Sequence, residues 1–193
     1  MTEPRTFRTR PGTIADLIRS RRTIHNFRAD AIPDTVILEA IESARWAQNH
    51  FLTEPWHFYL IGPVTAVAIS ELNSEIVHAD RGENAARIKL KRWLAMPSWL
   101  VVTCSRSTDQ KRQREDYSAC CCAIQNLSLH LWSEGVGMKW TTGPVTRDPH
   151  FYDLIGSDID LEEVVGLFWY GHPTEIPATK RVKSVAEITQ RLD

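Results

Sequence analysis

The chain has 193 residues, which is enough for one domain with a hydrophobic core and too few for two large domains. Its formal net charge of -1 argues against a broad positive binding surface, so we expect no nucleic acid partner. Hydrophobic residues make up 42% of the sequence, but no segment offers the roughly 18 apolar residues of a membrane span, so we expect one soluble domain over residues 1–193 with no membrane partner.

The first third of the chain shows two helix signals and one strand signal. Apolar residues recur at helical spacing over residues 14–18, after the capping residue Thr13, and predict a short first helix. A second helix is predicted over residues 33–47, because proline suits the first turn and one face is apolar. Residues 56–61 are aromatic and aliphatic and predict the first strand, whereas residues 1–12 are expected to form a short flexible arm.

The rest of the chain alternates irregularly between helix and strand. The longest periodic segment has apolar residues on several sides and predicts a central buried helix. This irregular alternation favours a layered α+β sandwich. The remaining predicted elements are helices over 65–78 and 84–95, a strand over 99–104, the central helix over 116–134, a short strand or turn over 138–144, a helix over 149–155 and a strand over 163–171.

The N-terminus and the cysteines favour a reducing compartment. The basic first ten residues have no apolar stretch behind them, which does not fit a secretory signal, so we expect a cytoplasmic protein. Cys120, Cys121 and Cys122 are consecutive and point in different directions on a helix, so they cannot form a chelating pair. Together with Cys104 they are expected to be small buried packing residues.

The common nucleotide and metal motifs are absent from the sequence. Neither G-x-G-x-x-G nor G-x-x-x-x-G-K-[ST] occurs, and neither does H-E-x-x-H. The seven histidines show no metal-ligand spacing, so a metal hydrolase ranks low and we expect no metal site.

The segment Arg21-Arg22-Thr23-Ile24-His25 is the clearest candidate for binding an anion. Two guanidinium groups can bind phosphate through paired donors, and a hydroxyl and an imidazole can add hydrogen bonds. The alternative is that cations at a helix C-terminus simply interact favourably with the helix dipole. The spacing of these residues alone favours the helix-dipole explanation, so the choice between the two depends on other segments of the chain.

Five segments resemble the nitroreductase family, and they occur in the family's order. The resemblance covers residues 14–188 and is greatest to the small members, in which a histidine such as His50 precedes the Pro-Trp strand. The segments are Arg21-Arg22-Thr23, Glu54-Pro55-Trp56-His57-Phe58, Ala123-Ile124-Gln125-Asn126-Leu127-Ser128-Leu129, Trp140-Thr141-Thr142-Gly143, and Val165 to Pro173 with the basic tail Lys180-Arg181.

The resemblance implies a fold, an assembly and a cofactor. The fold would be a three-layer α-β-α sandwich with a mixed, mainly antiparallel central sheet, and two chains would intertwine as a homodimer with FMN at the interface. Residues of one chain would hold the phosphate, ribityl chain and ring, and residues of the partner chain would approach the ring. The implied FMN-binding residues are Arg21, Arg22, Thr23, His25, Trp140, Thr141, Thr142 and Arg181 from one chain, and Trp46, Asn49 and His50 from its partner.

The activity implied by the resemblance is hydride transfer from NADH or NADPH through flavin N5 to an acceptor, with ping-pong kinetics. Candidate acceptors are nitroaromatics, quinones and similar conjugated molecules, and no residue is assigned as a general acid or base. Two alternatives stay open: a flavoenzyme of the same fold that dehydrogenates or reductively modifies one metabolite, and a flavin-binding protein without turnover.

Several site residues keep a structural alternative. Trp46 and Trp140 could be core aromatics, and Asn49 could end a helix. Trp93 and Met96 could form part of the entrance, although surface packing explains them as well. The chain also lacks the family's usual asparagine before Pro-Trp and carries Glu54 in place of glutamine. A carboxylate facing the flavin would repel a reduced ring, so we expect Glu54 to point elsewhere.

Overall fold

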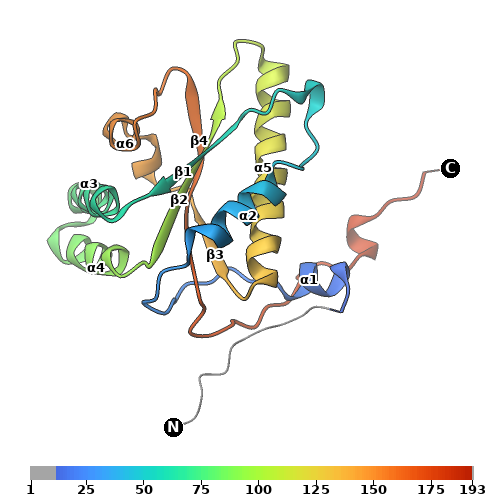
Figure 1. Ribbon diagram of the computed structural model, residues 1–193, viewed down its shortest axis with the longest axis horizontal. Helices are drawn as coiled ribbons and strands as arrows, with labels where there is room; N and C mark the ends of the chain where they lie inside the picture. The colour runs from blue at the N-terminus through green and yellow to red at the C-terminus, as the bar shows by residue number, and fades with distance from the viewer. Residues whose placement is uncertain (1–11, 193) are drawn as a thin grey trace, which may run out of the picture.

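The computed structural model describes residues 12–192, which are arranged around one four-stranded sheet (Figure 1). The strands are β1 (Trp56–Ile61), β2 (Ser98–Ser105), β3 (Gly137–Thr141) and β4 (Glu162–Gly171), in the order β1-β2-β4-β3. All three neighbouring pairs are antiparallel. The expected mixed character is limited, in this part of the chain, to one parallel bridge between Thr23 and Met138. The arm expected over residues 1–12 lies outside the described residues, apart from Gly12.

Helices cover both faces of the sheet and make three layers (Figure 1). One face carries α2 (Asp34–Ala44) and α5 (Gln110–Ser133); the other carries α3 (Pro63–Arg81), α4 (Glu83–Leu94) and α6 (Pro149–Ile155). Six consecutive residues of β2 are buried because helices cover both of its faces. The predicted α+β sandwich is therefore confirmed.

The long helix α5 begins earlier than the sequence predicted. Asp109 caps it, since its carboxylate accepts hydrogen bonds from the backbone N–H groups of Lys111 and Arg112. Residues 110–115 are charged or polar and mostly exposed, so the first turns of α5 show no apolar periodicity in the sequence. Beyond them the helix packs on α2 and on the sheet. The helix α2 in turn ends at Ala44, three residues before its predicted end.

On the other face, α3 and α4 form a hairpin joined by Gly82 alone. Gly82 has a φ of 78°, a left-handed value that glycine adopts without strain. The hairpin packs on the sheet through Trp93, which makes edge contacts with Trp99 and Trp169 at ring-centroid distances of 5.6 and 5.0 Å. Trp93 is 3% exposed, so it is a core residue rather than the surface residue favoured by the sequence.

A partly buried carboxylate, that of Glu162, holds three strands together near the start of β4. Glu162 accepts hydrogen bonds from three hydroxyl groups on β1, β2 and the loop before β4, and it pairs with a histidine on β1. These hydrogen bonds lower the pKa of Glu162 although burial opposes them. The partners are Tyr59 at 2.8 Å, Thr103 at 2.6 Å, Ser157 at 2.8 Å and His57 at 2.7 Å.

The ends of the described chain lie on the side of α5. Helix α1 (Ile14–Ser20) is capped by Thr13 as predicted, and Ser20 accepts a hydrogen bond from the Trp132 indole at 3.1 Å. Residues 174–192 are exposed throughout and run away from the sheet (Figure 1). Within residues 12–192, no helix has the length and hydropathy needed to cross a membrane.

The cysteines are all free within the described residues. Cys104 and Cys120 are fully buried, as expected for packing residues, whereas Cys121 and Cys122 are half-buried. Burial and neighbouring thiols raise the pKa of Cys121, and contact with Cys104 and burial raise the pKa of Cys120. The raised pKa values of Cys120 and Cys121 disfavour their thiolate forms and therefore a role as nucleophiles.

Candidate functional site

Two arginines directly after α1 carry donors without acceptors. The Nε atoms of Arg21 and Arg22 are buried, and neither has a hydrogen-bond partner among residues 12–192. Arg22 uses its Nη1 for the carbonyls of Arg19 at 2.6 Å and of Arg21 at 2.9 Å, which fixes the guanidinium. Buried polar atoms are nearly always paired, so two adjacent unpaired donors point to an acceptor that comes from outside.

The charge around Arg21 points the same way. Burial lowers the pKa of Arg21, and the nearby cations Arg181 and Arg22 lower it further. The structure therefore brings the tail residue Arg181 close to Arg21, although the two lie 160 positions apart in the sequence. Three guanidinium groups, two of them with unpaired buried donors, fit a phosphate.

The backbone that follows is held against the edge of the sheet. Ile24 is buried, and its N–H donates to the carbonyl of Met138 at 3.2 Å, while Thr23 and His25 on either side of it are exposed. A side chain at Gly137 would overlap Ile24, so this close approach requires glycine there. Alternation along this segment therefore presents Thr23 and His25 outward while Ile24 anchors it.

A second group of cations surrounds His25, and the sequence did not reveal it. Burial and the charges of Lys139 and Arg92 lower the pKa of His25. Burial also lowers the pKa of Lys139, as do Arg92 and Lys89. The ammonium of Lys139 lies 5.1 Å from the centre of the Trp169 ring, which orients it. Lys139 follows buried Met138 in the short strand β3 and is half-buried. A lysine in a mostly apolar strand was the one feature of the sequence that could have indicated this group of cations.

A cavity of about 570 Å³ lies beside these cations, between α3, α4 and the end of β3. Lys89 and Arg92 line it from α4, and Thr141 and Gly143 line it from the end of β3. This volume falls within the roughly 300–1,000 Å³ typical of small-molecule sites. Of the predicted residues at the end of β3, Thr141 borders this cavity directly.

Trp140 points to the opposite face of β3. Its indole N–H donates to the carbonyl of Val165 at 3.1 Å, and its ring lies 5.3 Å from that of Phe168. A side chain at Gly166 would overlap both the Trp140 and the Phe168 rings. Trp140 is 39% exposed, so it is neither a buried core aromatic nor a free surface residue.

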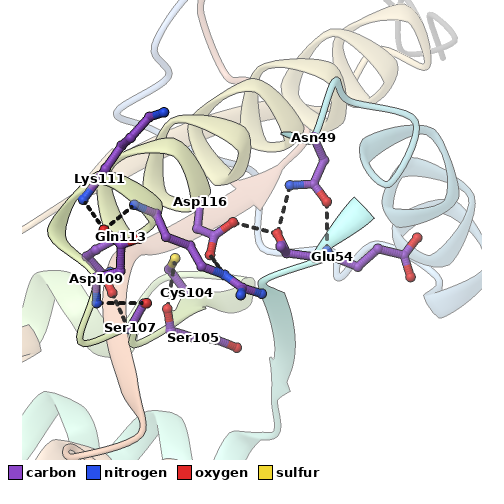
Figure 2. Close-up of polar contacts among 11 residues, drawn as sticks. Asn49, Glu54, Cys104, Ser105, Ser107, Asp109, Lys111, Gln113 and Asp116 are labelled. Carbon is purple, nitrogen blue, oxygen red and sulfur yellow. Dashed lines mark hydrogen bonds and ion pairs between the residues drawn. The ribbon is translucent and has the colours of Figure 1, made fainter. Parts of the chain in front are cut away.

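The remaining predicted residues belong to a separate loop near the start of α5 (Figure 2). Asn49 uses both ends of its amide inside the chain, since it donates to Thr53 at 2.9 Å and accepts from the N–H of Glu54 at 2.7 Å. Thr53 in turn donates to Asp116 of α5. Figure 2 shows the Glu54 carboxylate directed away from this network. Asn49 therefore holds the loop through one hydrogen bond at each end of its amide.

This loop is strained and exposes large apolar side chains. Phe51, Leu52 and Glu54 all have positive φ angles, of 62°, 50° and 43°, which non-glycine residues rarely adopt. Trp46, Phe51 and Leu52 are 80%, 80% and 82% exposed. Exposed apolar groups of this size on one loop commonly mark a contact with another molecule.

One chain does not bring this loop to the arginines. The loop contacts Asp116, and α1 contacts Trp132, sixteen residues further along α5. At 1.5 Å per residue these points are about 24 Å apart along the helix. Trp46, Asn49 and His50 thus lie far from Arg21 in the same chain, as expected if they serve the site of a partner.

Comparison with known proteins agrees with these features. A family model described as the nitroreductase family matches residues 18–172. The chain belongs to the nitroreductase family. Among nitroreductase relatives, YfhC of Bacillus subtilis strain 168, named as a candidate NAD(P)H nitroreductase, is 30% identical over 173 residues, which are 87% of this chain and 88% of its own length.

Solved structures of the nitroreductase family have the same fold. A nitroreductase-like family protein from Bacillus cereus gives a TM-score of 0.83 at 31% identity, covering 94% of this chain and 96% of its own. A candidate nitroreductase from Desulfovibrio desulfuricans, solved in complex with FMN, gives a TM-score of 0.73 over 93% of this chain and 96% of its own. At 17% identity, the second likeness concerns the fold alone.

Proposed function

We propose that this nitroreductase family member is an FMN-dependent oxidoreductase that uses NADH or NADPH to reduce a nitroaromatic, quinone or similar conjugated acceptor by a ping-pong mechanism. The observation that carries the proposal is the pair of buried, unpartnered guanidinium donors on Arg21 and Arg22 beside Arg181. The names of its relatives support it, because one is a candidate NAD(P)H nitroreductase and another was solved with FMN.

The three arginines hold the phosphate. Arg21 and Arg22 donate from the end of α1, and Arg181 closes the site from the tail. Exposed Thr23 adds a hydroxyl for the phosphate or the ribityl chain. The phosphate offsets the repulsion among these cations, so its binding is favoured by charge as well as by hydrogen bonds.

The second group of cations would hold the flavin ring. When bound, FMN supplies hydride transfer at N5 between the nicotinamide and the acceptor. His25, Lys139 and Arg92 stabilise negative charge at the ring edge, and Thr141 and Thr142 border the ring from the end of β3. We assign these residues to binding and orientation, and we assign no general acid or base.

The site is completed by a second copy of the chain. The exposed apolar loop around Trp46 and His50 and the exposed tail over residues 174–192 support a homodimer, since both present exposed surface to a second chain. Trp46 and His50 then approach the ring from the partner, and Asn49 positions them by holding the loop. The free cysteines support a reducing, cytoplasmic location.

A spectroscopic experiment tests the proposal. The purified protein is expected to be yellow or to become yellow with added FMN, and anaerobic NADH or NADPH is expected to bleach the flavin band. A later acceptor such as 4-nitrobenzoate should restore the colour. A protein that does not bind FMN would contradict the proposal. A protein that binds FMN, but whose FMN neither NADH nor NADPH reduces, would be a flavin carrier.

A further inference from the structure

The cavity beside α4 extends beyond the cations to a buried amide on α3. Asn73 lines the cavity and is 3% exposed, and its Nδ2 has no hydrogen-bond partner within residues 12–192. Buried donors without acceptors are rare in folded proteins, and one at a cavity wall fits a ligand oxygen.

The walls around Asn73 are apolar and suit a flat ring. Ile76 and Val77 of α3 line the cavity, as do Ile88 and Trp93 of α4. Small-molecule sites typically combine such walls with a few fixed polar groups that orient the ligand. Here the fixed polar group is the Asn73 amide.

The rim of this cavity is positively charged. Arg81, Lys89 and Arg92 line it, against one carboxylate, that of Asp80. Asp80 already pairs with the Nε of Arg81 at 2.9 Å, so it neutralises one of the three cations. The remaining charge attracts an anion rather than a cation.

We propose that the α3 end of this cavity is the acceptor subsite, that it takes a planar aromatic acceptor bearing an acidic group, and that Asn73 donates to an oxygen of that acceptor. The proposal rests on the function proposed above, since the cations next to the subsite are those assigned to the flavin ring. Asn73 is then a specificity-determining residue, and the α3–α4 hairpin selects the acceptor.

The test compares Asn73→Leu with the wild-type holoenzyme and with Asn84→Leu as a control. Leucine keeps the branched shape of asparagine and removes its donor, and Asn84 is an exposed asparagine of α4 outside the cavity. Each protein is reduced anaerobically by a nicotinamide and then reoxidised by 4-nitrobenzoate, by nitrobenzene or by oxygen. Asn73→Leu is expected to raise the KM for 4-nitrobenzoate about tenfold, the effect of one lost hydrogen bond. FMN affinity, the rate of reduction and reoxidation by oxygen should stay within about twofold.

Two further variants make the test independent of Asn73. Val77→Trp fills the cavity and should slow reoxidation by both aromatic acceptors while oxygen still reacts. Arg81→Gln should lower the preference for 4-nitrobenzoate over nitrobenzene about threefold, and salt should reduce the difference.

The outcomes separate the two proposals. A holoenzyme that is reduced and reoxidised normally, with the same acceptor KM in wild type, Asn73→Leu and Val77→Trp, would overturn the acceptor subsite and leave the proposed function standing. A protein that binds no FMN, or whose FMN neither nicotinamide reduces, overturns the proposed function and the subsite with it.

Discussion

Replacing Arg21 should change FMN affinity and the stability of the ligand-free protein in opposite directions. A charge-assisted hydrogen bond to phosphate is worth about 1.5–3 kcal/mol, so Arg21→Ala is expected to weaken FMN binding about 10- to 150-fold. Without ligand, burial and two neighbouring cations lower the pKa of Arg21. For a base, a pKa lower in the folded state means that folding disfavours its charge. This cost is present at neutral pH and is lost only as pH rises above the folded pKa.

The uncharged, unbranched variant Arg21→Met should therefore stabilise the ligand-free protein. Removing one buried, unpaired donor is worth about 1 kcal/mol, or roughly 2–4 °C in a chain of this size. Thermal unfolding with and without FMN measures the stability change, and fluorescence titration measures the affinity. Arg19→Met is the matched control, because Arg19 is an exposed cation in the last turn of α1. A ligand-free Arg21→Met protein that melts lower than wild type and binds FMN equally well would refute the reasoning.

Three further predictions concern the frame of the site. Gly166→Ala should destabilise the fold by about 2 kcal/mol or more, because the new methyl overlaps Trp140 and Phe168, and thermal unfolding should show a matching fall in Tm. Glu162→Gln should lower the free energy of unfolding by about 2 kcal/mol at pH 7, as measured in urea. Because the pKa of Glu162 is lowered in the folded state, this contribution is lost as pH falls through the folded pKa. The stabilities of the two proteins should therefore converge in acid. Asn49→Ala should release the loop before β1 and lower turnover several-fold while FMN affinity stays within about threefold, and equal losses in both would contradict its role in the loop.

The sequence predicted best those elements whose local and tertiary requirements agree. The strand over residues 56–61 has the same bounds in the structure, because its aromatic run is closed by Gly62-Pro63 on one side and a polar loop on the other. The helix over residues 149–155 also has its predicted bounds, since Asp148 and Pro149 start it and Gly156 ends it in the left-handed conformation. The start of α5 was missed because exposed polar turns carry no periodicity.

The candidate site was only partly accessible from the sequence. The order of motifs indicated Arg21, Arg22 and Arg181, and the structure places these three cations together. Lys89 and Arg92 were missed because on a solvated helix such residues look like ordinary surface charge; only packing of the α3–α4 hairpin next to β3 brings them to Lys139. The sequence also did not indicate that Asn49 holds the loop before β1, since this role depends on the contact of Thr53 with Asp116 of α5.

The spacing between the two groups of cations bears on what the site can bind. Arg21 and His25 are four positions apart on largely extended backbone, which spans at most about 13 Å, and the bridge of Thr23 to β3 holds that segment in place. A compact anion such as free phosphate can satisfy the arginines but cannot reach the cations around His25 at the same time. An elongated ligand with a phosphate at one end and a polar ring at the other can satisfy both. The arrangement therefore favours a nucleotide-like cofactor over an inorganic anion, and it leaves the α3 end of the cavity for a second molecule.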